Sequence, residues 1–168
     1  MLSWAVKEKP GPVAIRYPRG SDRGYSSGDW QGEENTVICH REGKDVTILT
    51  YGTLLENAME AAELLYTRGV EATVLRLMSI GELPVRQIAS QMAAGRPLYV
   101  MEEVSGGCGI RDMLCQQLQS IMPGCTVHGV DLGNRFVTHG SIDRLYHHYG
   151  LDGQSVCDSV LEVLGYEN

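Results

Sequence analysis

The sequence predicts an α/β domain of three layers, in which helices cover both faces of a mostly parallel sheet that has one antiparallel edge strand. The first observation is alternation, because short β-rich runs and segments with helical spacing of apolar residues follow one another over residues 37–164. The second is that several strand candidates are almost wholly apolar or β-branched, as strands buried on both faces are. The third is glycine, at 20 of 168 residues, which indicates many tight turns.

Two short elements precede a segment without periodicity. Residues 1–10 have the spacing of a helix, and Val13–Tyr17 is a β-rich run. The next stretch is rich in Gly, Ser, Asp and Asn and reads as a linker. The sequence therefore predicts three parts, namely an N-terminal segment at 1–20, a linker at 21–36 and an α/β domain at 37–168.

Within the predicted domain the runs alternate regularly. Strands are expected at 37–40, 45–50, 71–77, 98–101 and 126–130, and helices at 53–66, 84–92, 110–121, 141–149 and 152–164. The first two strands are separated by four residues that include Gly43, which predicts a β-hairpin. The second and third strands flank a helix, which requires a parallel pair joined by a crossover.

The helix after the second strand has the clearest end signals. Thr53 and Glu56 have the spacing of a capping box, in which the hydroxyl and the carboxylate satisfy free backbone N–H groups. Gly69 stands where a left-handed C-terminal cap belongs. Pro84 is the predicted first residue of the following helix.

The charge balance excludes several classes of protein. The 14 Lys and Arg residues against 21 Asp and Glu give a net charge of −7, which argues against nucleic-acid binding and against docking on anionic lipid. No apolar run approaches the roughly 20 residues of a membrane span. The N-terminal residues lack the pattern of a secretory signal, so a cytoplasmic protein is expected.

Arg16 and Arg19 are the first candidate site. They lie three residues apart at the end of a predicted strand, within the motif RYPRG. Guanidinium groups form paired charge-assisted hydrogen bonds with phosphate or carboxylate, and the flanking Pro and Gly favour a rigid turn. The motif predicts an anion site, while two solvated surface arginines remain the alternative.

Glu102–Gly109 is the second candidate. This glycine-rich turn lies between a predicted strand and a helix, where α/β proteins often bind ligands. Neither the dinucleotide-binding nor the P-loop pattern is present, and two carboxylates would repel a phosphate. The favoured interpretation is therefore a turn that packs the helix close to the sheet, with the glutamates capping it or lying in an interface.

The histidines and cysteines give weaker signals. His147 and His148 are adjacent in a predicted helix and point to different faces, and His139 precedes that helix, so their spacing does not favour a metal site. The five cysteines contain no CxxC pair, which indicates reduced thiols.

Five motifs, in order along the chain, resemble the last part of the 1-deoxy-D-xylulose-5-phosphate synthase family of the transketolase superfamily. They are GPVAIRYPRG at Gly11–Gly20, Gly43–Leu49 with Tyr51-Gly52-Thr53, Val100–Glu103 followed by Gly106–Gly109, His139-Gly140-Ser141, and Gly150-Leu151-Asp152. The resemblance covers nearly the whole chain and implies a transketolase C-terminal domain-like fold. It also implies that residues 1–20 are the tail of a pyrimidine-binding domain.

The resemblance further implies a function. Such synthases condense pyruvate with glyceraldehyde 3-phosphate and release carbon dioxide, in a step that leads to isoprenoids. Thiamine diphosphate and Mg²⁺ belong to upstream domains of the parent enzyme, so neither cofactor nor catalytic residue is expected in this chain, which alone should be inactive. Its expected roles are dimer packing and binding of the substrate phosphate by Arg16 first and Arg19 second. The implied partners are the remaining domains or a partner chain, in a homodimer, with neither nucleic acid nor membrane.

Two other functions stay open. The chain can be a stand-alone binding or regulatory domain that uses the Glu103–Gly109 turn for a small ligand. It can also be one subunit of a split transketolase that is active only with a partner chain.

Overall fold

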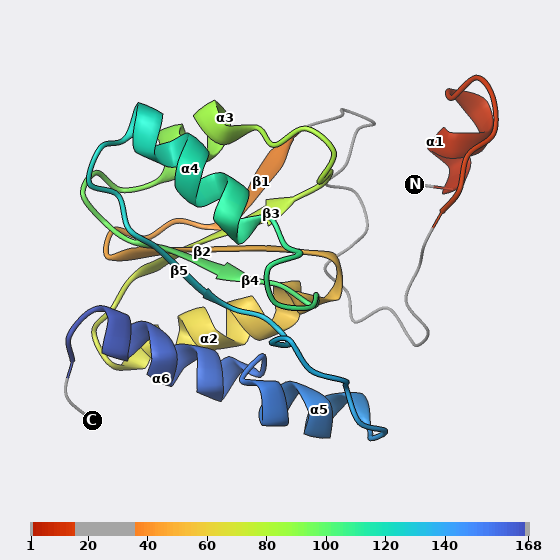
Figure 1. The fold of residues 1–168 in the computed structure, drawn as a ribbon. Helices are drawn as coiled ribbons and strands as arrows, with labels where there is room; N and C mark the ends of the chain where they lie inside the picture. Colours follow the sequence, from red (N-terminus) through yellow and green to blue (C-terminus); the bar gives the residue numbers. More distant parts are fainter. Residues whose placement is uncertain (1, 16–35, 167–168) are drawn as a thin grey trace.

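The computed structural model describes residues 2–15 and 36–166 (Figure 1). The strands are β1 (Val37–Arg41), β2 (Val46–Tyr51), β3 (Ala72–Leu77), β4 (Leu98–Met101) and β5 (Val127–Val130). The helices are α1 (Leu2–Lys7), the short 3₁₀ turn η1 (Gly52–Leu54), α2 (Leu55–Thr67), α3 (Val85–Gln91), α4 (Arg111–Ile121), α5 (Ile142–Tyr149) and α6 (Gly153–Val163).

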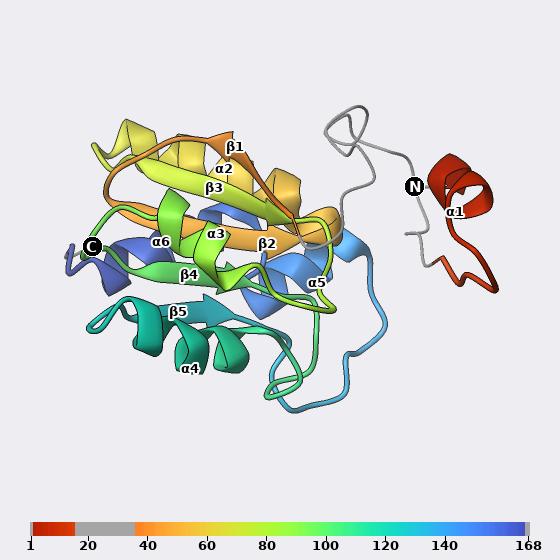
Figure 2. The ribbon, with the colours of Figure 1, turned by 90° about the horizontal axis from the view of Figure 1, so that it is seen from above.

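The five strands form one sheet in the order β1-β3-β2-β4-β5 (Figure 2). β2 pairs in parallel with both β3 and β4, and β4 pairs in parallel with β5. Only β1, at one edge, runs antiparallel to its neighbour β3. The predicted sheet, mostly parallel with one antiparallel edge strand, is therefore confirmed, and all four parallel strands end on the same side.

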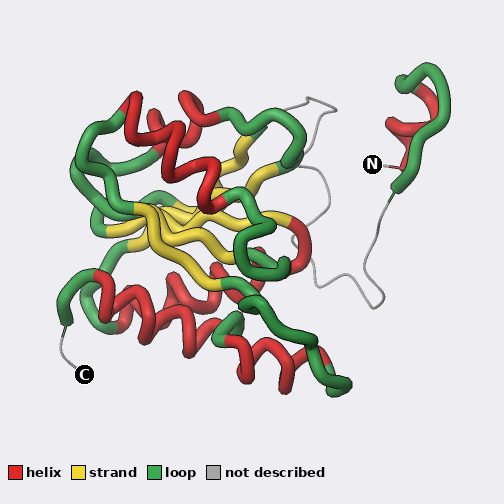
Figure 3. Tube along the Cα trace, viewed as in Figure 1, coloured by secondary structure: helices red, strands yellow, loops and turns green. Residues whose placement is uncertain are grey.

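Helices cover the sheet on both faces, which confirms the three layers (Figures 1 and 3). On one face α2 and α6 pack against a core that includes Ile48, Val74 and Tyr99. On the other face α3 and α4 cover a second core, which includes Leu49, Leu75 and Val100. The side chains of each strand alternate between the two cores, because successive residues of a strand point to opposite faces.

The predicted hairpin between the first two strands is wrong. β1 pairs with β3, and its connection to β2 lies against the chain just before β3. The backbone N–H groups of Lys44 and Asp45 both donate to the carbonyl oxygen of Glu71, at 3.0 and 2.9 Å. A Cβ atom on Gly43 would collide with the backbone of Glu71 and Ala72. The connection thus satisfies its hydrogen bonds on the neighbouring strand instead of folding back on itself.

The ends of the helices follow the sequence in part. Gly69 has φ of +80° and its N–H bonds to the carbonyl oxygen of Tyr66, which confirms the predicted left-handed cap. The capping box at Thr53 is wrong, because η1 occupies this position and α2 begins at Leu55 without a side-chain cap. Pro84 precedes α3 as its N-cap residue instead of beginning it.

The N-terminal expectations are tested only in part. The helix predicted over residues 1–10 is present as α1. Val13–Ile15, the described part of the strand predicted at Val13–Tyr17, forms no strand, because no strand in the described chain pairs with it. The predicted linker lies outside the described residues except for Thr36, so the proposed division of the chain stays a prediction. No helix within 2–15 or 36–166 is long and apolar enough to cross a membrane.

Candidate functional site

Arg16 and Arg19, the predicted phosphate-binding residues, lie outside the described residues. The candidate site that the structure describes is the end of the sheet where β2, β4 and β5 terminate. Three segments meet at this edge, namely η1, the turn at Glu102–Gly109 and the segment after β5 (Figure 1). Parallel strands place their carboxyl ends at one edge of a sheet, which brings these segments together.

Glu102 directly follows β4 and is 2% exposed. Its carboxylate accepts hydrogen bonds from the backbone N–H groups of Ile110, at 2.7 Å, and Arg111, at 3.1 Å. These N–H groups belong to the start of α4, where they have no partner within the helix. Glu102 therefore caps α4 from the sheet, as the favoured interpretation of this turn expects.

Two neighbours, Tyr51 and Gly109, lie directly against the buried Glu102 carboxylate. The Tyr51 hydroxyl donates to its Oε1 atom at 3.1 Å, and burial, followed by the charge of Glu102, raises the pKa of Tyr51. Gly109 lies so close that a Cβ atom there would collide with the carboxylate. A side chain at position 109 would displace the Glu102 carboxylate from the N–H groups that it caps, so glycine here preserves the cap.

Glu103, the next residue, accepts hydrogen bonds from a different part of the fold than Glu102 does. Its carboxylate is exposed and accepts from the Thr53 hydroxyl and from the Tyr146 hydroxyl, both at 3.3 Å. Thr53 comes from η1 and Tyr146 from α5, so Glu103 links the turn to the α2–α6 side of the sheet. The two glutamates thus tie the turn to both layers of helices.

The turn also runs beside the segment that follows β5. The N–H of Leu132 donates to the carbonyl oxygen of Val104, and that of Gly106 to the carbonyl oxygen of Gly133, both at 3.0 Å. A Cβ atom on Gly106 would lie 3.2 Å from the Gly133 carbonyl carbon. These backbone contacts leave no space between the two segments at this point.

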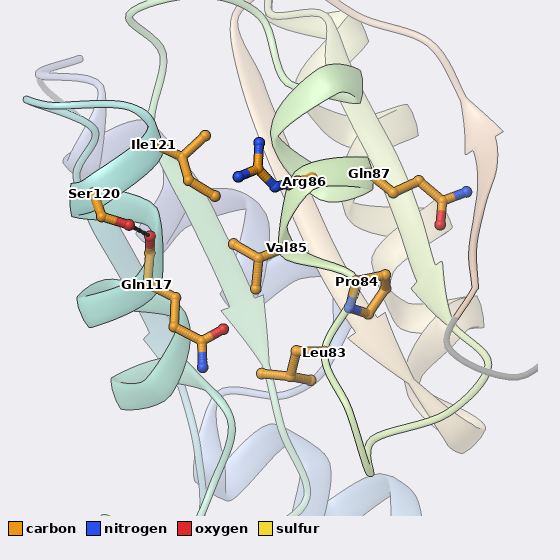
Figure 4. Close-up of a pocket in the computed structure, with 8 residues that line it drawn as sticks. All are labelled: Leu83, Pro84, Val85, Arg86, Gln87, Gln117, Ser120 and Ile121. Carbon is orange, nitrogen blue, oxygen red and sulfur yellow. Dashed lines mark hydrogen bonds between the residues drawn. The ribbon is translucent and has the colours of Figure 1, made fainter.

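Two hollows of the described surface lie beside the helices and β5 and are not lined by the Glu102–Gly109 turn. A shallow groove of about 540 Å³ lies between α3 and α4, where Val85 and Ile121 form part of the lining and Arg86 and Gln117 supply polar groups (Figure 4). A second, of about 320 Å³, lies beside β5 and includes His128 and Arg111. The Arg111 guanidinium is already bound to Asp131 at 3.1 Å and to the Gly129 carbonyl oxygen at 3.2 Å, so it is not free to bind an anion there.

The histidines and cysteines do not form a reactive centre in the described chain. His147 lies 3.3 Å from the Asp152 carboxylate, and His139 and His148 are exposed. No group of three or more His, Cys, Asp or Glu side chains within the described residues is placed to hold a metal ion. All five cysteines are free, and burial raises the pKa of three of them, which disfavours the thiolate form: Cys39, Cys125 and Cys157.

At this edge the polar side chains of Glu102 and Glu103 hold the turn, the helices and the sheet together. Both glutamates already have hydrogen-bond donors within the fold, which weakens the interpretation of Glu103–Gly109 as a ligand site. Sequence reasoning missed Tyr51 and Tyr146. Their signal was weak, since each is one tyrosine near the end of a predicted strand or helix, and only the fold brings them to Glu102 and Glu103.

The comparisons with known proteins identify the domain. The transketolase C-terminal domain family matches residues 35–156. The 1-deoxy-D-xylulose-5-phosphate synthase of Chlorobaculum tepidum is 36% identical over 96% of this chain and 26% of its own length, and that of Heliobacterium modesticaldum is 33% identical over 97% and 25%. This chain thus spans about a quarter of the length of these relatives.

Solved structures agree with this result. A split-gene transketolase, described as an inactive β4 tetramer, is 25% identical with a TM-score of 0.67, over 81% of this chain and 44% of that one. A transketolase mutant from Pichia stipitis, 15% identical with a TM-score of 0.58 over 79% of this chain and 18% of its own, shares the fold. The chain therefore belongs to the transketolase C-terminal domain family and is homologous to the C-terminal region of 1-deoxy-D-xylulose-5-phosphate synthases.

Proposed function

We propose that this chain is the C-terminal domain of a 1-deoxy-D-xylulose-5-phosphate synthase-like enzyme. The parent enzyme joins pyruvate to glyceraldehyde 3-phosphate and releases carbon dioxide. One observation carries the proposal: the likeness to the synthases covers 96% of the chain, whereas the domain family begins only at residue 35. The likeness therefore includes the earlier segment with the motif RYPRG, in which Arg16 and Arg19 lie.

The roles proposed for this chain are dimer packing and binding of the substrate phosphate. Arg16 is the first candidate for the phosphate contact and Arg19 the second. A guanidinium group suits this task because its planar fork gives two parallel hydrogen bonds to phosphate oxygens. Neither arginine takes part in bond making, so their effect falls on the affinity for the aldehyde substrate.

The cofactor chemistry belongs to the rest of the parent enzyme in this proposal. No group of three or more His, Cys, Asp or Glu side chains within the described residues could hold a metal ion, and the proposal places Mg²⁺ and the diphosphate in the upstream domains of the parent. Thiamine diphosphate, when bound elsewhere in the parent, supplies the decarboxylation and the formation of the carbon–carbon bond. This chain alone is then inactive, and product formation by the purified chain would contradict the proposal.

A chimera tests the phosphate role. The matched quarter of the Chlorobaculum tepidum synthase is replaced by this chain, and KM is measured for glyceraldehyde 3-phosphate and for unphosphorylated glyceraldehyde. Loss of a charge-assisted hydrogen bond costs about 1.5–3 kcal/mol, so Arg16→Ala should raise KM for the phosphorylated substrate by about 10- to 150-fold. KM for glyceraldehyde should stay the same.

Arg23→Ala is the matched control, since Arg23 lies near the motif but outside it. Arg19→Ala should have the same direction of effect as Arg16→Ala but a smaller size. If Arg16→Ala changes KM for the two aldehydes equally, or no more than Arg23→Ala does, the phosphate role is wrong.

The likeness to a split-gene transketolase favours a second candidate function. In this alternative the chain is one subunit of a two-chain transketolase. Transketolase activity that appears only on mixing with a separate partner chain, in the absence of synthase activity from the chimera, would support this alternative over the first.

A further inference from the structure

The segment after β5, together with the first turn of α5, exposes apolar side chains on an unbroken run of surface residues. Every residue from Asn134 to Arg144 is exposed, and we call this run the 134–144 face. Phe136 is 98% exposed, Ile142 54% and Val137 44%. Figure 1 shows this segment projecting past the end of the sheet at which the parallel strands terminate.

The backbone that carries the 134–144 face is held in place. At its start, the Gly133 N–H bonds to the Asp131 carboxylate at 2.7 Å, and its carbonyl oxygen accepts from Gly106. The hydroxyl of Tyr149, a buried residue, reaches the carbonyl oxygen of Phe136 at 3.5 Å. The backbone is therefore tied to the fold at Gly133 and contacts Tyr149 at Phe136, while the Phe136 side chain remains in solvent.

This exposure is costly for the isolated domain. Burial of a phenylalanine is strongly favourable, and contiguous apolar groups with a polar rim mark interaction sites on protein surfaces. The rim here is basic, because Arg135 and Arg144 outnumber Asp143, and the remaining titratable groups of the segment and of α5 are three histidines and two tyrosines. The rim therefore has the opposite sign to the chain as a whole, whose net charge is −7.

We propose that the 134–144 face docks on the part of a longer synthase that lies outside the quarter matched by this chain. The occupant is a protein surface with an apolar pocket for Phe136, edged by carboxylates that face Arg135 and Arg144. This inference rests on the proposed function, since the relatives supply about three further quarters of chain for this domain to contact. We expect carboxylates on the partner surface because they would complement the charges of Arg135 and Arg144.

A second copy of this chain fits the face less well. Two-fold pairing of the face with itself would place both arginines of each copy in one contact, with only Asp143 of each copy to offset them. Like charges brought together in this way destabilise an interface. The aromatic side chain at the centre and the charged rim instead fit a different, complementary surface.

Hydrogen exchange in the chimera with the Chlorobaculum tepidum synthase tests the inference. We expect the backbone amides of residues 134–144 to exchange at least about tenfold more slowly in the chimera than in the isolated chain. Phe136→Ser should remove most of this protection. Met113→Ser is the control, because it also replaces an exposed apolar side chain by serine, but Met113, 46% exposed, lies on α4, on the opposite face of the sheet.

The results separate this inference from the proposed function. An active chimera whose 134–144 amides exchange as fast as in the isolated chain overturns the inference and leaves the function standing. Protection that Phe136→Ser removes, in a chimera without synthase activity, supports the docking surface and contradicts the function. Protection that is equally insensitive to both variants overturns the role of Phe136.

Two measurements on the isolated chain keep the inference testable if the chimera fails to fold. We expect binding of an apolar fluorescent dye that Phe136→Ser reduces more than Met113→Ser does, with unchanged thermal stability. A large loss of stability on Phe136→Ser would mean that the ring packs within the domain. A dimer that Phe136→Ser converts to a monomer, as judged by light scattering, would mean that the occupant is a second copy. Either result overturns the proposal.

Discussion

The two consecutive glutamates after β4 allow a stringent test of how the carboxyl edge of the sheet is held together. Glu102→Gln and Glu103→Gln make the same chemical change at neighbouring positions, and each removes one negative charge. They differ in burial and in the donors that they meet, because Glu102 is 2% exposed and caps α4, whereas Glu103 is exposed. The comparison therefore isolates the effect of the buried cap.

The magnitude follows from the hydrogen bonds of Glu102. Its two oxygens accept from two backbone N–H groups, at 2.7 and 3.1 Å, and from the Tyr51 hydroxyl, at 3.1 Å. Glutamine keeps one accepting oxygen but replaces the other by an NH₂ group, which would face a backbone N–H. Loss of one hydrogen bond to a charged group, with an unsatisfied donor left behind, costs about 1.5–3 kcal/mol. Glu103→Gln keeps an oxygen that can accept its exposed bonds, so its cost should stay within about 0.5 kcal/mol.

Urea unfolding of the whole chain at pH 7 measures both variants. With an m-value of about 1–3 kcal/mol per M, Glu102→Gln should lower the unfolding midpoint by about 1 M, and Glu103→Gln should leave it nearly unchanged. Hydrogen exchange at the Ile110 and Arg111 amides should rise only in Glu102→Gln. Equal effects of the two variants, or no effect of Glu102→Gln, would refute the argument that the buried carboxylate caps α4.

Two further predictions concern pH. The Asp152 carboxylate caps α6 by accepting hydrogen bonds from Ser155. Burial alone would raise the pKa of Asp152. The hydrogen bonds from Ser155 and the nearby His147 outweigh burial, so the pKa of Asp152 is lowered. Asp152→Ala should thus destabilise the chain by about 0.5–2 kcal/mol at pH 7, and the difference in urea unfolding should disappear as the pH falls below about 4; a difference that persists at pH 2 would contradict this. The pKa of Tyr51 is raised, so the folded chain keeps a proton that the unfolded chain loses, and stability should fall as the pH rises past about 10. Tyr51→Phe should make this alkaline loss smaller in urea unfolding at pH 8 and pH 11, and an unchanged loss would show that Tyr51 does not cause it.

The parts of the fold that local sequence determines were predictable. Gly69 marks the end of α2, because a residue without Cβ adopts φ of +80° at little cost, and this signal is local. The buried strands were visible because parallel strands with both faces covered consist of apolar residues. Alternation of such strands with helices then predicts the layers.

Strand pairing was not predictable in the same way. The short connection around Gly43 suits a hairpin, but the carbonyl oxygen of Glu71, 26 residues beyond Asp45, accepts its N–H groups. Thr53 and Glu56 have the spacing of a capping box, yet the Thr53 hydroxyl bonds to Glu103, 50 residues away. In both cases a long-range partner competes with the local one, and the spacing of residues carries no information about it.

In the candidate site, too, local contacts were predictable from the sequence and long-range contacts were not. The capping role of Glu102 was predictable as one of two interpretations, because a carboxylate before a glycine turn and a helix has donors close by. Tyr51 and Tyr146 reach the glutamates only through the order of strands and helices. The phosphate role of Arg16 and Arg19 stays a prediction, since both lie outside the described residues.

Carbon dioxide release tests the central claim most directly. Three samples are compared: the Chlorobaculum tepidum synthase without its matched quarter, the same protein with this chain in that place, and this chain alone. Release of labelled carbon dioxide from pyruvate that depends on glyceraldehyde 3-phosphate is expected from the second sample and not from the other two. If the second sample folds, and its release is no greater than that of the first, the chain does not serve as the C-terminal domain of such a synthase.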